Sequence, residues 1–579
     1  MKLLRSTTSI TYETIAFCVL LLIHLIPLFT GKFFPTSDGA AHLYNAELMK
    51  DMLLGTSPVH VEFLEWNIYP DPNRFSHVFL TTLLLVFPDY IAEKLLLATY
   101  VILFAVSFRY LIRNINYKAT FLSVFAFPLV YNLSFWYGFY NFCFSLIFFF
   151  LFVGYWLRTQ YNYTLKRTIV LIFLTLCMYF SHPVSYVFSI LFLGLWIVMD
   201  AFRRNKPADY THTGYWKRVF LLQIPKPDWK FLFRQIGMSV LIYGVTGILL
   251  LVYVFRIGAS AYYYPSSKLT QVFQLTQLMP LQFLAQDETL LLGILYHVLF
   301  CLLIVCVIRY QRMSILHYVV LFGLLAGLAL YYIFGPDGAA GGSGMHPRIG
   351  LFFYIYVVIF AAFYAWKLST QRIVYMLVAL ISITLMIVRT KELLRLQSVF
   401  DEIMTAQEHI PAHAVMLPYC FYPIDSTLER NFPIDYYPLK HYSNYLLLGK
   451  KGISLDNYEA RTGYFPLNWN LDKISDPVQL NHLNDVMYEK EHVRSIEFHE
   501  EMIGQPVDYV TLVGVHATDK SLHKDVITEL EEEFDLIYES DNRIVHVYKK
   551  KTLGRPIGSV ISAPGKERPL AKRTEATLD

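Results

Sequence analysis

Two side chains able to take up or release protons lie four residues apart, just after the first apolar segment of the chain. Asp38 and His42 stand in FPTSDGAAHLYNAELMKDML, residues 34–53, with small residues between them. If residues 40–53 are helical, the two side chains share one face of the helix. A carboxylate beside an imidazole can act as a general base toward a hydroxyl group. The pair therefore predicts a catalytic or ligand-binding site.

Two other interpretations of these residues remain open from the sequence. Ser37 or Asp38 could serve as a helix N-cap, accepting hydrogen bonds from the free amides of the first turn. Asp38 and His42 could also hold a divalent cation, although two candidate ligands do not establish a metal site. The sequence indicates no other cofactor.

Further candidate residues lie between apolar segments downstream. His182 stands in the tripeptide SHP, and an ionisable group surrounded by apolar sequence tends to face a cavity or a polar partner. His346 and Arg348 end the Gly-rich stretch GPDGAAGGSGMHPR, residues 335–348. The planar fork of Arg suits phosphate, because it makes two charge-assisted hydrogen bonds. We expect these three residues to bind substrate.

Lys268 and the tyrosines around Tyr263, in AYYYPSSK, form a second candidate for binding a lipid phosphate or a sugar. Each candidate also has a structural alternative. His182 could be a polar group satisfied inside a helix bundle, and the Gly-rich loop could be a plain connection with an anchoring arginine. Lys268 and the tyrosines could be interfacial anchors.

The composition indicates that these residues belong to a membrane protein. The chain has 579 residues, of which 55% are hydrophobic and only 16% are charged, whereas a soluble domain carries about 25% charged residues. Apolar runs at residues 290–308 and 373–388 approach the ~20 residues that cross ~30 Å of hydrocarbon. We expect a polytopic α-helical membrane protein. The net charge of +4 gives no reason to expect a nucleic-acid partner.

Hydropathy predicts eleven transmembrane helices. They are expected near residues 12–30, 95–111, 119–134, 141–157, 168–181, 184–201, 236–256, 286–308, 316–334, 350–366 and 373–389. With this number, every cluster of Lys and Arg falls on the cytoplasmic side, as the positive-inside rule requires. The N-terminus is then inside. A cleaved signal peptide is disfavoured for the first segment, because no small-residue cleavage site follows it.

Two parts of this topology have alternatives. Residues 75–87 contain only a short apolar run, which we interpret as a half-inserted helix in the outer leaflet rather than a span. Residues 168–201 are predicted to form either two short spans that turn at residues 181–183 or one helix kinked at Pro183.

Charged residues return after about residue 390, where the transmembrane module, residues 1–390, is expected to end. We expect an extracytoplasmic α/β domain at residues 391–550, on the same side as the first external loop, residues 31–94. A disordered tail is expected at residues 551–579. Strands are predicted at residues 413–418, 506–514 and 543–549, and a helix at residues 521–534.

This organisation resembles the GT-C superfamily of membrane glycosyltransferases, especially the bacterial relatives of protein mannosyltransferases and of lipid A aminoarabinose transferases. The resemblance rests on a first span that leads into an external loop with the acidic motif SDGAAH, residues 37–42, and on the Pro-rich segment YPDPNRF, residues 69–75. It also rests on the terminal external α/β domain. The resemblance covers most of the chain in architecture, but only residues 36–48 in motif.

The resemblance implies a reaction and its partners. In such enzymes an acidic residue of the first external loop is implicated in catalysis, and the donor is a sugar on a polyprenyl phosphate or pyrophosphate. Asp38 would then activate the acceptor hydroxyl, while Arg348, with Lys268, would stabilise the leaving lipid phosphate. The preferred location is the cytoplasmic membrane of a bacterium, although an endoplasmic reticulum membrane would satisfy the same physics. Many relatives have an Asp-Glu or Glu-x-Asp pair, whereas Gly39 follows Asp38 here.

Two other classes of protein remain as alternatives. A lipid or glycan transporter would also have many spans and a polar external cavity, but it is expected to show inverted repeats, and no clear repeat is evident. A non-catalytic envelope assembly protein would use the external domain to bind a partner.

Overall fold

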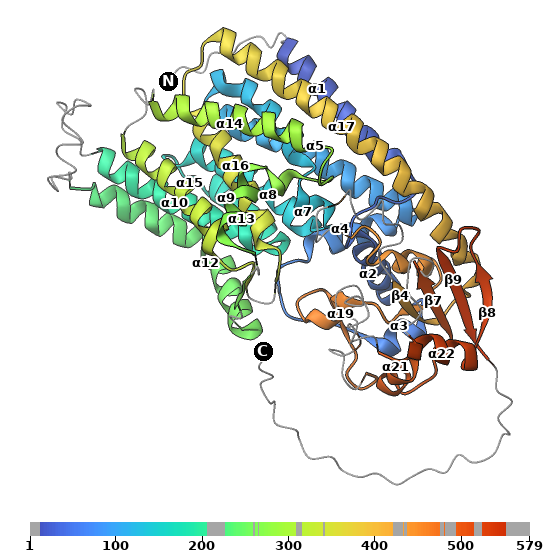
Figure 1. Ribbon diagram of the computed structural model, residues 1–579. Coiled ribbons are helices and arrows are strands. Elements are labelled where there is room, and N and C mark those ends of the chain that lie inside the picture. The colour runs from blue at the N-terminus through green and yellow to red at the C-terminus, as the bar shows by residue number, and fades with distance from the viewer. Residues whose placement is uncertain are drawn as a thin grey trace.

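The computed structural model describes residues 12–204, 226–258, 261–263, 266–308, 315–339, 342–420, 432, 437–474, 480, 494–514 and 524–551. A bundle of helices lies beside a smaller part that contains a β-sheet (Figure 1). Except for Lys551, the tail expected at residues 551–579 lies outside the described residues.

Long apolar helices make up most of the bundle, which makes the chain a polytopic helical membrane protein. Within the described ranges, nine segments are long and apolar enough to cross a membrane: Tyr12–Phe29, Asp89–Ile115, Tyr117–Trp136, Tyr140–Thr159, Pro183–Arg204, Trp229–Ile257, Thr289–Ile308, Met345–Ala362 and Leu368–His409. Among them are α1 (Tyr12–Leu25), α5 (Asp89–Ile115), α8 (Tyr140–Thr159), α10 (Pro183–Arg204), α12 (Trp229–Ile257), α14 (Thr289–Ile308) and α16 (Met345–Ala362). Helices α9 (Leu165–Ser181) and α15 (Ile315–Phe334) occupy the two remaining ranges in which spans are expected.

The structure distinguishes between the alternatives for residues 75–87 and 168–201. Helix α4 (Phe75–Leu84) has ten residues, which is too short to cross a bilayer. Helices α9 and α10 are separate, because His182 between them is extended, with φ −160° and ψ 134°. The alternative of one kinked helix is therefore wrong. The residue before a proline is disfavoured in the helical region, so Pro183 ends α9 and begins α10.

The segment Tyr117–Trp136 is not one continuous helix. It consists of the 3₁₀ helix η2 (Tyr117–Phe125) and the short helices α6 (Ala126–Val130) and α7 (Leu133–Trp136). The side chain of Asn132 holds the break after Val130: its Oδ1 accepts from the Phe135 amide at 3.1 Å, and its Nδ2 donates to the Leu129 carbonyl at 3.0 Å.

A buried ion pair also braces this break. Arg389 of α17 (Leu368–Met404) contacts Glu288, with Nε at 2.5 Å from Oε1, and both side chains are at most 1% exposed. The same guanidinium donates to the carbonyls of Tyr131, at 3.0 Å, and Leu281, at 2.6 Å. One cation therefore joins α17, the segment before α14 and the broken span.

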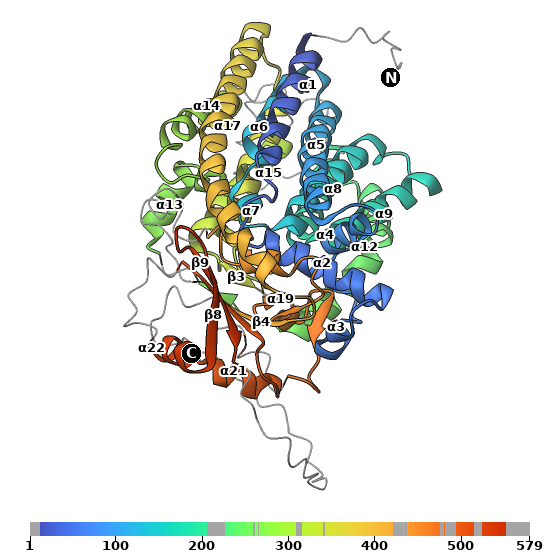
Figure 2. The same ribbon diagram turned by 90° about the vertical axis from the view of Figure 1, so that its right-hand side faces the viewer.

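Helix α17 links the bundle to the sheet. It has 37 residues, so it is about 55 Å long at ~1.5 Å per residue. In Figures 1 and 2 it runs beside α1 and ends next to the strands. The helix continues beyond residue 390, where we expected the transmembrane part to end, and is followed by η4 (Thr405–His409).

Within the described ranges the sheet has five strands, in the order β5-β4-β7-β9-β8. Strand β4 is parallel to β5 and β7, whereas β9 is antiparallel to β7 and β8. The strands are β4 (Val415–Cys420), β5 (Ile453–Ser454), β7 (Tyr509–Val513), β8 (Phe534–Glu539) and β9 (Val545–Lys550). The three predicted strands are β4, β7 and β9, and α22 (Lys524–Glu533) lies in the predicted helical range. Helix α21 (Ile496–Ile503) precedes β7.

The first loop and the C-terminal segment form one structure. Helix α2 (Gly39–Leu54), which follows the first span, packs against η5 (Tyr442–Leu447), and α3 (Pro58–Phe63) leads into β1 (Leu64–Trp66). Strand β1 pairs antiparallel with β6 (Leu467–Trp469). Asn45 and Asn457 exchange side-chain hydrogen bonds at 3.0 and 2.9 Å. These contacts place the short helix α19 (Tyr458–Thr462) against the first loop.

Removal of the carboxylate from the buried pair should be strongly destabilising. Glu288→Ala would leave the Arg389 charge unpaired inside the bundle, so we expect a loss of about 3–5 kcal/mol. As a control, Glu62→Ala removes a half-exposed partner of Lys473 and should cost less than ~1 kcal/mol. Denaturation midpoints in detergent would measure both variants. Equal effects would show that the buried pair does not brace the break.

Candidate functional site

A polar cavity of about 120 Å³ brings together four of the residues singled out from the sequence, namely Asp38, His42, His182 and Arg348. They come from the start of α2, the α9–α10 junction and the start of α16, so three distant segments converge. The other lining residues are Asn73, Phe139, Asn141, Phe142, Gly342, Ser343, Tyr458, Tyr464 and Phe465.

The Asp38 carboxylate is available to the cavity. Asp38 occupies the N-cap position of α2, but its side chain makes no capping hydrogen bond. The hydroxyl of Ser37 has no hydrogen-bond partner within the described ranges either. The interpretation of this stretch as a side-chain cap is therefore wrong. The Asp38 carboxylate instead accepts a hydrogen bond from Tyr458 and lies 3.8 Å from Nε2 of His441.

The C-terminal segment orients these partners of Asp38. Nδ1 of His441 lies 3.2 Å from Oδ2 of Asp456, so the ring stands between two carboxylates. The His441 ring also stacks on Tyr458 at a centroid distance of 4.6 Å. This arrangement fixes the ring and hydroxyl that face Asp38.

The backbone around Asp38 is held by the turn after α7. The amides of Ser37 and Asp38 donate to the carbonyls of Trp136 and Tyr137, each at 3.1 Å. Gly138 in this turn has φ +82°, and a Cβ added to it would lie 2.9 Å from the amide nitrogens of Asp38 and Gly39. Only glycine allows the two backbones to approach this closely.

Arg348 is a buried cation that is only partly neutralised. It is 7% exposed, and its Nη1 donates to the Ser343 carbonyl at 2.6 Å. Its guanidinium lies over the ring of Phe139, at 4.2 Å, and near that of Phe142, at 5.7 Å. Its Nε has no hydrogen-bond partner among the described residues. Because burying an unpaired donor is costly, the site is suited to an anion.

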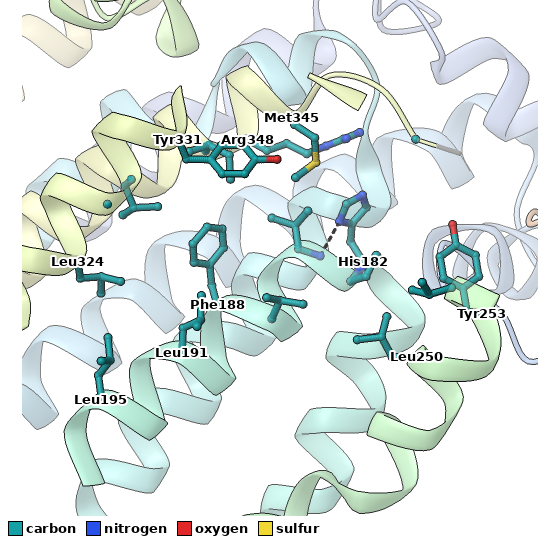
Figure 3. Close-up of a pocket in the computed structure, with 18 of the residues that line it drawn as sticks. His182, Phe188, Leu191, Leu195, Leu250, Tyr253, Leu324, Tyr331, Met345 and Arg348 are labelled. Carbon is teal, nitrogen blue, oxygen red and sulfur yellow. Dashed lines mark hydrogen bonds between the residues drawn. The ribbon is translucent and has the colours of Figure 1, made fainter. Parts of the chain in front are cut away.

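A second, apolar groove of about 760 Å³ opens beside the polar cavity. It runs between α10, α12, α15 and α16, and shares Asn73, His182, Gly342 and Arg348 with the cavity. Figure 3 shows His182 and Arg348 toward one end of the groove and leucines such as Leu195 toward the other. The groove volume lies within the ~300–1,000 Å³ typical of small-molecule sites.

The other candidates from the sequence lie elsewhere. His346 is buried and its Nδ1 lies 2.7 Å from Asp337 Oδ1, so it fixes the loop before α16. Lys268 begins α13 (Lys268–Thr276), where its Nζ lies 5.9 Å from the Phe334 ring centre. Tyr263 is 59% exposed. Neither Lys268 nor Tyr263 lines the groove or the cavity, as far as the described residues define them.

His42 faces a buried carboxylate as well as the cavity. Its Nδ1 lies 2.5 Å from Oε1 of Glu459, and Nε2 of His77 lies 2.7 Å from Oε2. Burial raises the pKa of the Glu459 carboxyl, but the two imidazoles outweigh burial and lower its pKa to about 2. Burial lowers the pKa of His42, yet the charge of Glu459 reverses the sign, so that the pKa is raised. Among the described residues, His42, His77 and Glu459 form a group of three side chains that could hold a metal ion.

Several of these residues were not predicted from the sequence, because most come from the C-terminal segment. They are His77, His441, Asp456, Tyr458, Glu459 and Tyr464. The sequence separation between His77 and Glu459 is 382 residues, which no periodic pattern can reveal. No protein-family model matches the chain, and no curated protein gives a significant match.

The close approach at Gly138 predicts a site-specific defect. Gly138→Ala should displace the backbone of Asp38, in addition to the ~1–2 kcal/mol that a left-handed conformation costs a non-glycine residue. The matched control is Gly55→Ala, because Gly55 also has a positive φ, +63°, but open space around its Cβ position. Melting temperatures in detergent should fall further for Gly138→Ala. If both variants lose the same stability, the turn does not constrain Asp38.

Proposed function

We propose that the protein is a membrane glycosyltransferase that moves a sugar from a polyprenyl-phosphate-linked donor to an acceptor outside the cytoplasm. The observation that supports this most is the junction between the apolar groove and the polar cavity at Arg348 and His182. A lipid chain in the groove would place its phosphate beside a buried guanidinium. The sugar would then lie in the cavity that Asp38 lines.

Each polar group has a defined part in the proposed reaction. Asp38 removes the proton from the acceptor hydroxyl as its oxygen attacks the anomeric carbon, and the bond from that carbon to the phosphate oxygen breaks. Arg348 stabilises the charge that develops on the departing polyprenyl phosphate. Tyr458 and His441 orient the Asp38 carboxylate, and Tyr464 borders the space for the sugar. Lys268 and Tyr263 have no part here, because they lie outside both spaces.

The proposed topology has eleven crossings in the cytoplasmic membrane of a bacterium. It adds α9 and α15 to the nine long segments. The N-terminus then lies inside, and the first loop and C-terminal α/β domain lie outside, in agreement with the positions of Lys and Arg in the sequence.

Bound lipid gives the most direct test of the donor site. We expect wild-type protein to co-purify with polyprenyl phosphate species, and Arg348→Ala to retain about 10- to 100-fold less, since a hydrogen bond to a charged group is lost. Native mass spectrometry would measure retention. Lys268→Ala, an exposed cation outside both spaces, is the matched control and should bind normally. If Lys268→Ala and Arg348→Ala behave alike, the groove does not end in a phosphate site.

Turnover tests the role of Asp38. Asp38→Asn cannot accept the proton, so transfer in proteoliposomes should fall by ~10²–10⁴-fold while the sugar-linked lipid stays bound. Unchanged transfer in Asp38→Asn would rule out Asp38 as the base.

A transporter is the second candidate, because the broken segment Tyr117–Trp136 is a feature that many transporters use at their binding sites. The same proteoliposomes distinguish the classes. Cleavage of the donor supports the enzyme, movement of an intact lipid or glycan supports the transporter, and neither supports an assembly protein.

A further inference from the structure

We propose that His42, His77 and Glu459 bind a zinc ion that joins the first loop to the C-terminal segment. The three side chains come from α2, α4 and α19, and each is at most 3% exposed. Their candidate ligand atoms lie within 4.8 Å of one another. Over the described ranges, they are the one group of three His, Cys, Asp or Glu side chains that converges in this way.

The types of ligand favour zinc over other common divalent cations. Two imidazoles and one carboxylate form a zinc donor set, whereas Mg²⁺ and Ca²⁺ prefer oxygen ligands alone. Two nitrogens bound to tetrahedral zinc at ~2.0–2.1 Å lie about 3.3 Å apart. Nδ1 of His42 and Nε2 of His77 are 3.2 Å apart. Two ring nitrogens at this distance need a proton or a cation between them, and 3.2 Å accommodates either.

The carboxylate reaches both rings with different oxygens. Oε2 of Glu459 makes the 2.7 Å contact with His77, while Oε1 lies 2.5 Å from Nδ1 of His42. Each ring nitrogen therefore faces a different oxygen of the same carboxylate, and this is the convergence that one shared cation requires. The backbone carbonyl of Gly138 accepts a hydrogen bond from the His42 ring, which is the usual second contact of a metal-bound histidine.

The position of the trio gives the ion a structural role next to the cavity. Helix α19 has only five residues, and it begins with Tyr458, which donates to Asp38. Glu459 is the adjacent residue, so an ion bound by Glu459, His42 and His77 would fix Tyr458 relative to Asp38. This inference goes beyond the proposed function, since the ion would join the same segments in an enzyme, a transporter or an assembly protein.

The test is the zinc content of the full-length protein, purified in detergent with an affinity tag that contains no histidine. We expect about one zinc per chain in the wild type by inductively coupled plasma mass spectrometry. His77→Ala and Glu459→Gln should each contain at least ~10-fold less. His60→Ala is the matched control and should keep its zinc, because His60 is a buried histidine of the same loop whose ring contacts the Gly452 carbonyl instead.

A second measurement uses the wild type alone, in case a ligand variant fails to fold. Removal of zinc by a chelator should lower the melting temperature, and added Zn²⁺, but not Mg²⁺, should restore it. The proposal is overturned if the wild type carries no zinc, if both ligand variants retain it, or if Mg²⁺ restores stability equally well. None of these readouts uses sugar transfer, so failure here leaves the proposed reaction untouched.

Discussion

The structure depends on satisfying the backbone of a helix that breaks inside an apolar bundle. Non-helical backbone in such surroundings is costly unless each amide and carbonyl finds a partner. At this break, Asn132 and Arg389 satisfy the groups before α7, and the amides of Ser37 and Asp38 pair with the carbonyls of Trp136 and Tyr137 at its C-terminal end. The contacts that stabilise the break therefore also position Asp38. Because Gly138 has no side chain, the backbone after α7 can lie close enough to Asp38 for these hydrogen bonds to form.

The second constraint is the burial of α2 on nearly all sides. A helix on a protein surface normally has a polar face, but α2 buries charged and polar residues as well as apolar ones. Their partners belong to the C-terminal segment: Glu47 accepts from the Gly449 amide, and the Tyr44 hydroxyl donates to the Gly452 carbonyl. The C-terminal part is consequently packed against the first loop and does not form a separate unit. It completes the surroundings of the first loop and supplies one wall of the cavity.

The sequence was informative where local chemistry decides structure. The short apolar runs at residues 413–418, 506–514 and 543–549 predict the strands β4, β7 and β9, and Asp38, His42, His182 and Arg348, singled out by residue type, all line the same cavity. Returning charge after residue 390 did not reveal that α17 continues to Met404, because Lys, Glu, Leu and Arg are good helix formers and a helix can extend past a membrane span. Glu459 and His77 were missed because only tertiary folding brings them together.

Arg348 explains why the groove and the cavity belong to one site. A guanidinium removed from water loses solvation that must be replaced by other contacts. The rings of Phe139 and Phe142 and the Ser343 carbonyl replace part of it, through cation–π attraction and one hydrogen bond. Asp38 is held by Tyr458, so the two opposite charges are anchored by different neighbours. Among the described residues no ion pair joins Asp38 to Arg348, so separate contacts hold the two charges on the wall of one small cavity.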